Sequence, residues 1–384
     1  MGGERIYLSL AHMGGGEQKY IQEAFDTNWV VPLGPNVDAF EEDLQHFLGG
    51  EHYVTALSAG TAAIHLGLVL AGVEAGDEVI CQSFTFSASA NPIAYQGARP
   101  VFVDSEADTW NMDPMLLEEA IEGRIKAVGK PPKAIIPVHL YGMPAKIDEI
   151  LAIAERYGIA VVEDAAEAMG SEYKGRKCGT FGAFGALSFN GNKMITTSGG
   201  GALVCRTEEE KVRARFYATQ AREKAPYYQH EKIGYNYRMS NISAGIGRGQ
   251  MEVVAEHIAQ RRANHAFYQE AFSHVEGIKV MDNPSAACSS NFWLTTILID
   301  PKVYKPTPNE VREALERENI ETRLLWKPLH RQPVFKECSY YGGDVAWGLF
   351  SRGLCLPSGP LLTEDDLGRV VESVKGVLRK GGAT

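Results

Sequence analysis

The feature that most constrains the fold is an alternation of short apolar runs with helical patterns between about residues 50 and 205. The apolar runs have the length and content of buried strands, and they are EVICQSF (78–84), KAIIPVHL (133–140), IAVVEDAA (159–166) and GALVCR (201–206). Helical patterns lie at TAAIHLGLVLAG (61–72), DPMLLEEAI (113–121) and KIDEILAIAERYG (146–158). This alternation predicts βαβ units and a mostly parallel sheet, which binds ligands at the carboxyl ends of its strands.

The pattern changes after about residue 250. A long helical stretch leads into a strand-like run, FWLTTILI (292–299), and then into two helices, TPNEVREAL (307–315) and TEDDLGRVVESV (363–374). Each of these helices starts with a threonine followed three residues later by an acid, which is typical of a capping box. We therefore expect a large α/β domain over residues 1–254 and a smaller α+β domain over residues 255–384.

Composition excludes several classes of protein. Acidic residues outnumber basic ones by 48 to 38, and the net charge of −10 argues against nonspecific nucleic-acid binding. No apolar run is long enough for a membrane span or a signal peptide, so we expect a cytoplasmic protein without a membrane partner. The six cysteines are scattered without metal-ligand spacing, which predicts reduced thiols and no metal site.

Two charged residues stand at positions where ordinary structure would not need them. Lys193 lies among small uncharged polar residues, just before a glycine run, in SFNGNKMITTSGGGALV (188–204). Asp164 ends an apolar run, where a buried carboxylate costs free energy unless a cation or donors meet it. The ordinary alternatives are a solvated loop lysine and a helix-capping or ion-paired acid.

Two further features suit a flat, phosphorylated ligand. Gly60 and Thr61 lead directly into a helix, whose first N–H groups can bind phosphate. Phe86 follows a predicted strand, and its ring could stack on a flat ligand. Taken alone, a glycine-threonine pair of this kind is more often a plain turn, and such a phenylalanine is more often a core aromatic. Together with a lysine that can form a Schiff base and an acid that can keep a ring nitrogen protonated, they are the parts of a pyridoxal-phosphate (PLP) site.

The chain resembles the DegT/DnrJ/EryC1/StrS family of sugar-nucleotide aminotransferases, which share the aspartate-aminotransferase (type I) PLP fold. The resemblance covers nearly the whole chain. It rests on seven motifs in the right order, which are SAGTAAIHLGL, SFTFSASANP with GARPVFVD, IIPVHLYGMPAKID, VVEDAAEAMGSEYKG, GALSFNGNKMITTSGGGAL, GYNYRMSNISAGIG and KPLHRQPVF. No one of these motifs is specific alone, but the ordered set is.

The resemblance implies roles for residues of the PLP site. Lys193 corresponds to the Schiff-base lysine, Asp164 to the partner of the pyridinium nitrogen, and Phe86 to the stacking ring. The phosphate would be held by Gly60, Thr61 and Ser188.

Other residues are implied to act at a shared interface or on the substrate. Asn236, in the GYNYR motif, corresponds to an asparagine that reaches the phosphate from the other subunit, so a homodimer with its active site at the interface is expected. His330, in KPLHRQP, falls in a segment that contacts substrate. Arg238 and Lys327, with Arg323, are positional candidates for the substrate diphosphate. The ordinary alternative for Asn236 is a loop amide, and for His330 it is a surface histidine. The basic residues would ordinarily be solvated.

One departure from the family pattern bears on the substrate. Glu167 stands where the family often has glutamine or histidine, at a position that bonds the cofactor's phenolic oxygen. A glutamate there must be protonated or redirected, because two negative oxygens repel. The form EDAAE with FNGNKMITTSGGGA resembles the branch that makes UDP-4-amino-4,6-dideoxy-N-acetylglucosamine. The resemblance thus implies amino transfer from L-glutamate to UDP-4-keto-6-deoxy-N-acetylglucosamine, in glycan biosynthesis.

Several alternatives stay open at this point. A dTDP- or GDP-linked sugar, or a C3 ketone, would use the same cofactor residues, and no motif shows the product stereochemistry. A PLP-dependent sugar dehydratase is disfavoured because a histidine replaces the lysine in that branch. A regulatory or noncatalytic PLP-binding protein is disfavoured because the chain encodes no basic DNA-binding helix pair.

Overall fold

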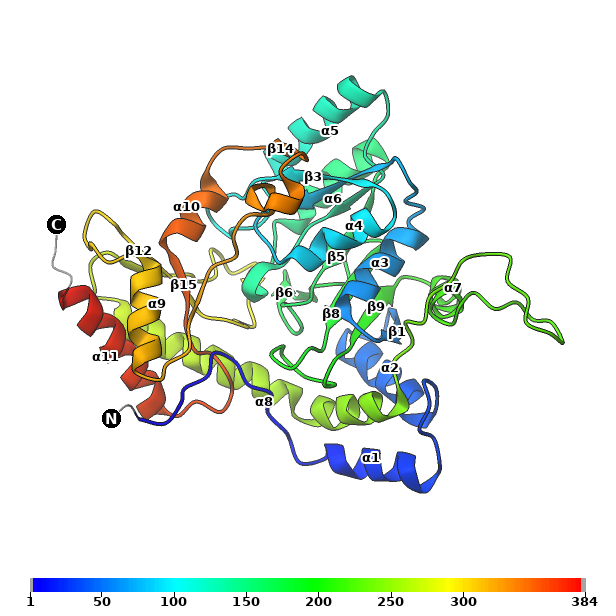
Figure 1. Cartoon of the computed structure of the whole chain (residues 1–384), viewed down its shortest axis with the longest axis horizontal. Coiled ribbons are helices and arrows are strands. Elements are labelled where there is room, and N and C mark those ends of the chain that lie inside the picture. Colours follow the sequence, from blue (N-terminus) through cyan, green and yellow to red (C-terminus); the bar gives the residue numbers. More distant parts are fainter. Residues whose placement is uncertain (1–2, 381–384) are drawn as a thin grey trace.

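A central eight-stranded sheet dominates the computed structural model, which describes residues 3–380 (Figure 1). The strands, in spatial order, are β1 (Tyr53–Leu57), β9 (Gly201–Cys205), β8 (Phe184–Ser188), β5 (Ala160–Asp164), β4 (Ala134–Ile136), β2 (Glu78–Gln82), β3 (Arg99–Val103) and β14 (Ser339–Tyr341). Within this sheet, as far as the structure describes it, β9 alone runs antiparallel to its neighbours. The predicted type I fold with a mostly parallel sheet is confirmed.

The strands are apolar on both faces because helices cover both faces of the sheet. In β2, Val79 and Cys81 face one side and Ile80 faces the other. The first side carries α3 (Gly60–Leu70), α4 (Asn91–Tyr95) and α7 (Glu208–Ala218). The second side carries α5 (Pro114–Val128), α6 (Ile147–Tyr157), α2 (Pro35–Phe47) and part of α8 (Asn241–Phe272). The predicted strands and helices of residues 61–206 are therefore confirmed.

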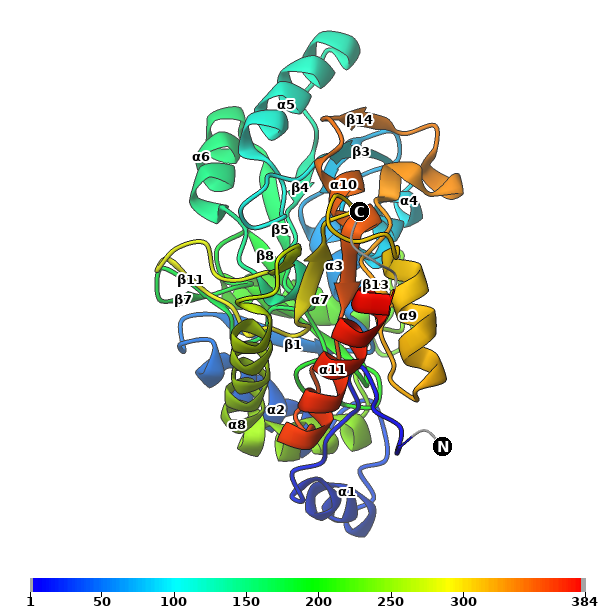
Figure 2. The same ribbon diagram turned by 90° about the vertical axis from the view of Figure 1, so that its left-hand side faces the viewer.

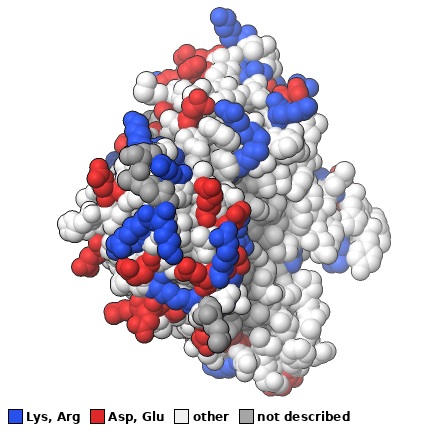
Figure 3. Space-filling view, turned by 60° about the vertical axis from the view of Figure 1, so that its left-hand side comes forward, with Lys and Arg blue, Asp and Glu red and all other residues white. Residues whose placement is uncertain are grey.

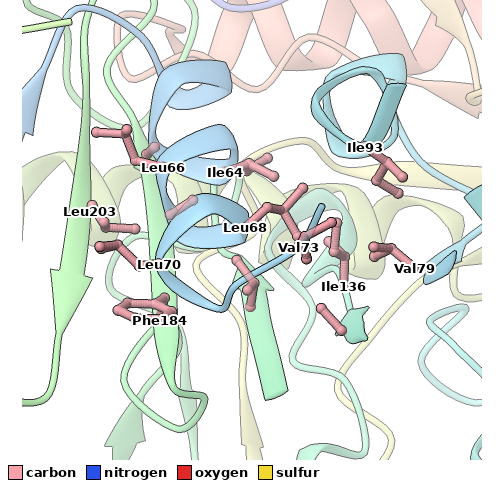
Figure 4. Packing of buried hydrophobic residues seen from close by; sticks show 14 of the residues in the cluster. Ile64, Leu66, Leu68, Leu70, Val73, Val79, Ile93, Ile136, Phe184 and Leu203 are labelled. Carbon is pink, nitrogen blue, oxygen red and sulfur yellow. The ribbon is translucent and has the colours of Figure 1, made fainter. Parts of the chain in front are cut away.

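Helix α3 is apolar around most of its circumference because it is buried between the sheet and the helices beside it. Figure 4 shows Leu66 and Leu70 of α3 beside Leu203 of β9 and Phe184 of β8. Its N-terminus is thereby held rigidly at the end of β1. This rigidity matters because the first turn of α3 faces the candidate site.

Strand β8 was not among the predicted strands, since FGALS is short and rich in small residues. Gly185 is required within it: a Cβ there would lie 2.0 Å from the carbonyl oxygen of Gly179. The close packing of the segment around Gly179 against β8 explains the small side chains of this strand.

A second, four-stranded antiparallel sheet forms beyond α8. Its strands, in spatial order, are β10 (Ile278–Val280), β12 (Thr296–Ile299), β15 (Gly353–Cys355) and β13 (Arg323–Leu324), and it is covered by α9 (Pro308–Arg317) and α11 (Glu364–Lys380). The capping boxes predicted for α9 and α11 are present, with Thr307 and Glu310 exchanging bonds, and Thr363 and Asp366 likewise. The predicted boundary at residue 254 falls inside α8, and the division into two domains stays a prediction.

The predicted strand 292–299 is only half strand, because β12 begins at Thr296. Phe292 has a left-handed backbone (φ 47°), and the side chain of Asn291 accepts the N–H of Trp293 at 2.8 Å. This local turn replaces the sheet pairing of residues 291–293 and directs them toward the candidate site.

The remaining elements join these parts. They are α1 (Glu17–Asp26), α10 (Val345–Arg352), a small sheet of β11 (Cys288–Ser289), β6 (Glu172–Tyr173) and β7 (Arg176–Lys177), and 3₁₀ turns at Ser87–Ser89, Leu140–Gly142, Leu329–Arg331 and Pro333–Phe335. The N-terminal segment lies beside the C-terminal part of the chain, since Ile6 bridges to Ile320 (Figure 2). Residues 219–240 form a loop that extends away from the body between α7 and α8 (Figure 1).

The surface carries charged residues of both signs, in line with the composition. Figure 3 shows Lys and Arg side chains standing among Asp and Glu side chains over one face. Among the described helices, none combines the length and apolarity that a membrane span requires. In the described residues, no group of three or more His, Cys, Asp or Glu side chains is placed to hold a metal ion.

Candidate active site

A cavity of about 320 Å³ lies at the carboxyl ends of β5 and β8, beside the N-terminus of α3. This is the edge of the sheet at which the strand pattern predicts a ligand. The cavity brings together these predicted cofactor residues: Gly60, Thr61, Phe86, Asp164, Glu167, Ser188 and Lys193. Sequence positions more than 130 residues apart therefore meet in one place.

Lys193 is not a solvated loop residue. Its side chain is only 14% exposed, and Nζ lies 3.6 Å from Oε1 of Glu167. The same Nζ lies 4.0 Å from the centroid of the Trp293 ring. The amine therefore points into the cavity between a carboxyl group and an aromatic face.

Asp164 is buried at the last position of β5, and its carboxylate is held by donors. Oδ2 accepts the hydroxyl of Ser89 at 2.6 Å, and Oδ1 accepts the N–H of Ala166 at 3.1 Å. The hydroxyl of Thr85 lies 2.9 Å from that of Ser89, which extends the hydrogen-bonded chain. Ser89 and Thr85 were missed by sequence reasoning, although both lie in SFTFSASANP.

A second buried carboxylate, Glu163, anchors the strand behind Asp164. It accepts the N–H groups of Phe181 and Gly182, both at 2.6 Å, and faces Nε2 of His139 at 2.8 Å. Burial opposes its ionisation, yet His139 and the N–H groups of Gly182 and Gly179 hold the pKa of Glu163 below its ordinary value. Glu163 thus stabilises the end of β5 that presents Asp164.

Glu167 stands in a different electrostatic environment. Burial raises the pKa of its carboxyl group, although the Lys193 amine and the N–H of Tyr141 oppose the rise. Oε2 accepts that N–H at 2.7 Å, and Oε1 faces the amine. The direction of the shift lets Glu167 keep its proton to a higher pH than an ordinary glutamate, which is the sense that a protonated acid at this position requires.

The N-terminus of α3 forms a cradle suited to an anion. The preceding residue, Ala59, has no side-chain acceptor that could cap the helix, so its first N–H groups are available to a ligand. A Cβ on Gly60 would lie 2.9 Å from Cβ of Ser188, and one on Gly201 would lie 2.4 Å from the nitrogen of Gly60. A side chain at either glycine would collide with these neighbours, so the two glycines allow β8, β9 and the start of α3 to pack closely around the cradle.

Phe86 is not a core aromatic. Its side chain is 51% exposed, and its ring lies 5.2 Å from that of Trp326, with both lining the cavity. Such a half-exposed ring leaves a face available for a flat ligand. The cavity therefore offers the set of groups that fits PLP: an anion cradle, a half-exposed ring, a buried acid and a lysine amine.

The other predicted residues lie outside this cavity. Asn236 and Arg238 line a separate depression of about 860 Å³. His330 places Nδ1 2.7 Å from the hydroxyl of Ser83 and stacks on Tyr340 at 3.8 Å, while Lys327 is half-buried beside Trp326. Their roles toward phosphate or substrate stay predictions.

Arg238 also has partners within the protein. Its guanidinium is buried, forms an ion pair with Glu41, and donates to the carbonyl oxygen of Ala56 at 2.9 Å. Its contact with a substrate diphosphate stays a prediction, and the ion pair with Glu41 shows that Arg238 also has a structural role. Arg323, exposed and paired with Glu321 at 2.6 Å, also lies outside the cavity.

Comparisons with known proteins agree with this geometry. The model of the DegT/DnrJ/EryC1/StrS aminotransferase family matches residues 12–375. The candidate pyridoxal phosphate-dependent aminotransferase EpsN of Bacillus subtilis is 52% identical, over 96% of this chain and 95% of that protein. GDP-perosamine synthase of Caulobacter vibrioides is 35% identical, over 97% of this chain and 98% of that one.

Solved structures give the same result. A DegT DnrJ EryC1 StrS aminotransferase from Brucella abortus superposes with a TM-score of 0.87 at 32% identity, over 94% of this chain and 95% of that one. Family, sequence and fold agree over nearly the whole chain. The chain belongs to the DegT/DnrJ/EryC1/StrS aminotransferase family and is a PLP-dependent sugar aminotransferase.

Proposed function

We propose that this enzyme moves the amino group of L-glutamate to C4 of a 4-keto-6-deoxy nucleotide sugar, with UDP-4-keto-6-deoxy-N-acetylglucosamine as the preferred substrate. The observation that carries the substrate assignment is Glu167, placed in the cavity 3.6 Å from the Lys193 amine. Its EDAAE motif resembles the branch that makes the corresponding 4-amino UDP sugar.

The cavity residues would divide the binding of the cofactor among them. PLP, when bound, supplies a ring that accepts the electron pair left on a carbon that loses its proton. Gly60, Thr61 and Ser188 would bind the phosphate, and Phe86 would cover the ring. Asp164, held by Ser89 and Ala166, would keep the proton on the ring nitrogen.

Lys193 would have two tasks. Its Nζ would hold the cofactor covalently and, once released, would act as the base and acid of the reaction. It would take the proton from Cα of glutamate in the first half-reaction and return one to C4 of the sugar in the second. A single amine can serve both halves because donor and sugar occupy the same cavity in turn.

Glu167 would act as a neutral acid. Its raised pKa extends to higher pH the range of the protonated form, which can donate toward an oxygen of the cofactor. A carboxylate in the same place would repel a negative oxygen. The proposal therefore gives Glu167 the task that glutamine or histidine is expected to have in relatives.

We also propose a homodimer in which Asn236 reaches the phosphate site of the partner subunit. In support, Asn236 lines a depression whose rim carries apolar side chains, among them Trp29 and Leu33, which are 39% and 54% exposed. The neighbouring Val30 and Val31 are also exposed. Exposed apolar groups of this density are typical of an interface between protein chains.

A product assay tests the substrate. The enzyme, PLP and L-glutamate would be incubated with UDP-4-keto-6-deoxy-N-acetylglucosamine and, in parallel, with the GDP- and dTDP-linked 4-keto-6-deoxy sugars. Mass spectrometry would detect the amino sugar, and NMR would place the amine. Preferential amination of the UDP sugar at C4 is expected. Amination of the GDP sugar alone would favour the second candidate, which the 35% identity to GDP-perosamine synthase supports.

A further inference from the structure

Trp293 forms the wall of the cavity that covers the Lys193 amine. The indole ring is almost fully buried, with 1% of the residue exposed, and Nζ of Lys193 stands 4.0 Å from its centroid. Lys193 follows β8, whereas Trp293 belongs to the turn before β12, 100 residues further along the chain. A residue from the C-terminal part thus covers the reactive amine of the N-terminal part.

Trp293 is fixed relative to the lysine by three hydrogen bonds, one from its ring and two at its backbone. Its Nε1–H donates to the carbonyl oxygen of Asn192, the neighbour of Lys193, at 2.7 Å. Its backbone N–H donates to Asn291 at 2.8 Å, and its carbonyl oxygen accepts from the buried Arg261 at 2.7 Å. Indole and lysine loop are therefore held as one unit.

The same network reaches Glu167 on the other side of the amine. The side-chain amide of Asn291 donates to the carbonyl oxygen of Glu167 at 3.0 Å. The amine of Lys193 accordingly sits between a carboxyl group 3.6 Å away and an aromatic face 4.0 Å away. An aromatic face attracts an ammonium group through its quadrupole, most strongly for tryptophan and where water is excluded.

We propose that Trp293 is the holding surface for the Lys193 amine whenever that amine is not bonded to the cofactor. The inference rests on the proposed role of Lys193. During each turnover the released amine must stay within reach of the reacting carbon and must not swing into solvent. The buried ring limits where Nζ can go, and its face favours the amine after it has gained a proton. Trp293 is thus a positioning residue.

Lysine labelling tests this without relying on turnover. The full-length enzyme would be loaded with pyridoxamine phosphate, which leaves Lys193 unbonded, and treated with acetic anhydride before peptide mapping. In Trp293→Leu, acetylation of Lys193 relative to exposed Lys126 should rise about three- to tenfold, as loss of a cation–π contact allows. Trp293→Phe, which keeps an aromatic face but loses the Nε1–H, should stay close to the wild type.

Trp326→Leu is the matched control, because it removes another indole from the same cavity, and it should leave Lys193 labelling unchanged. Equal labelling of Lys193 in Trp293→Leu and the wild type would overturn the proposal. The proposal would also be overturned if Lys193 were labelled equally in Trp293→Phe and Trp293→Leu, since the hydrogen bond to Asn192 would then be the contact that matters. If the leucine variant does not fold, Trp293→Phe is compared with the wild type instead, and a rise of about threefold or more in its Lys193 labelling would overturn the proposal.

A kinetic readout separates positioning from general damage. Conversion of the cofactor by L-glutamate and by Cα-deuterated L-glutamate would be followed by absorbance in single turnovers. Trp293→Leu should slow conversion about tenfold and enlarge the isotope effect, because transfer of the proton by a poorly placed amine becomes limiting. A slower rate with an unchanged isotope effect contradicts the proposal. Conversion at the wild-type rate by Lys193→Ala would instead refute the proposed role of Lys193 itself.

Discussion

Replacing Glu41 with glutamine should destabilise the protein strongly, because it would leave a buried arginine without its counter-charge. The side chains of Glu41 and Arg238 are 1% and 6% exposed, so water cannot compensate for the lost charge. Removing one partner of such a buried pair costs about 3–5 kcal/mol. Lys211 and Arg215 also contact Glu41, at 3.1 and 3.2 Å, but they are more exposed and should contribute less.

The same pair connects two segments of the site. Arg238 also donates to the carbonyl oxygen of Ala56 in β1, and the N–H of Ser58 donates to the carbonyl oxygen of Tyr237 at 2.8 Å. The GYNYR segment is thereby held against the strand that leads into the phosphate cradle. We therefore expect Glu41→Gln to weaken PLP binding as well as stability.

Urea unfolding at one protein concentration would measure the effect, with Glu42→Gln, an exposed neighbour, as the control. Burial works against ionisation of Glu41, but Arg238, Lys211 and the N–H of Ala56 lower its pKa overall. Its contribution is therefore complete above the unfolded pKa of about 4.3 and is lost as pH falls through the lower folded pKa. A loss below about 1 kcal/mol at pH 7, or one equal to that of Glu42→Gln, would refute this reasoning.

Three further predictions concern single side chains. Ser89→Ala should lower the free energy of unfolding by about 1.5–3 kcal/mol and weaken PLP binding, because Asp164 loses a charge-assisted hydrogen bond. Denaturant and PLP titrations would measure both effects. Equal effects from Ser87→Ala would contradict this prediction. Burial lowers the pKa of His65 in the folded protein to about 4. As pH falls, the unfolded chain therefore protonates this histidine before the folded protein does, and the free energy of unfolding should fall by up to about 3 kcal/mol between about pH 6.5 and pH 4. His65→Gln should lack that dependence in unfolding curves measured across pH. Glu167→Gln should keep activity within about threefold of the wild type, since the amide imitates the neutral acid, and it should flatten any decline of kcat/KM at alkaline pH. A more than hundredfold loss of activity would show that an ionisable group is required.

Much of the fold was predictable because its signals are local. Buried strands and their helices leave apolar runs of fixed length and period, and the ends of parallel strands meet at one edge of the sheet. That is why Asp164 could be placed at this edge from the sequence, whereas Lys193, which follows the unpredicted β8, was joined to it only because the two residues are parts of a PLP site.

Contacts between distant segments leave no such signal. The sequence predicts a strand at Trp293 because FWLTTILI is mostly apolar, and only the left-handed Phe292 and the Asn291 side chain turn it toward the cavity. Likewise, nothing near Arg238 in the sequence indicates its ion pair with Glu41, almost 200 residues earlier. In both cases tertiary packing decides what local pattern does not.

The most direct test of the central claim is to find which residue bonds the cofactor. The enzyme loaded with PLP would be reduced with borohydride, which makes the bond between a lysine nitrogen and the cofactor's aldehyde carbon permanent, and its peptides would be mapped by mass spectrometry. The phosphopyridoxyl group should lie on the peptide that contains Lys193 and should be absent from Lys193→Ala. Its presence on another lysine, or its persistence in that variant, would contradict the account.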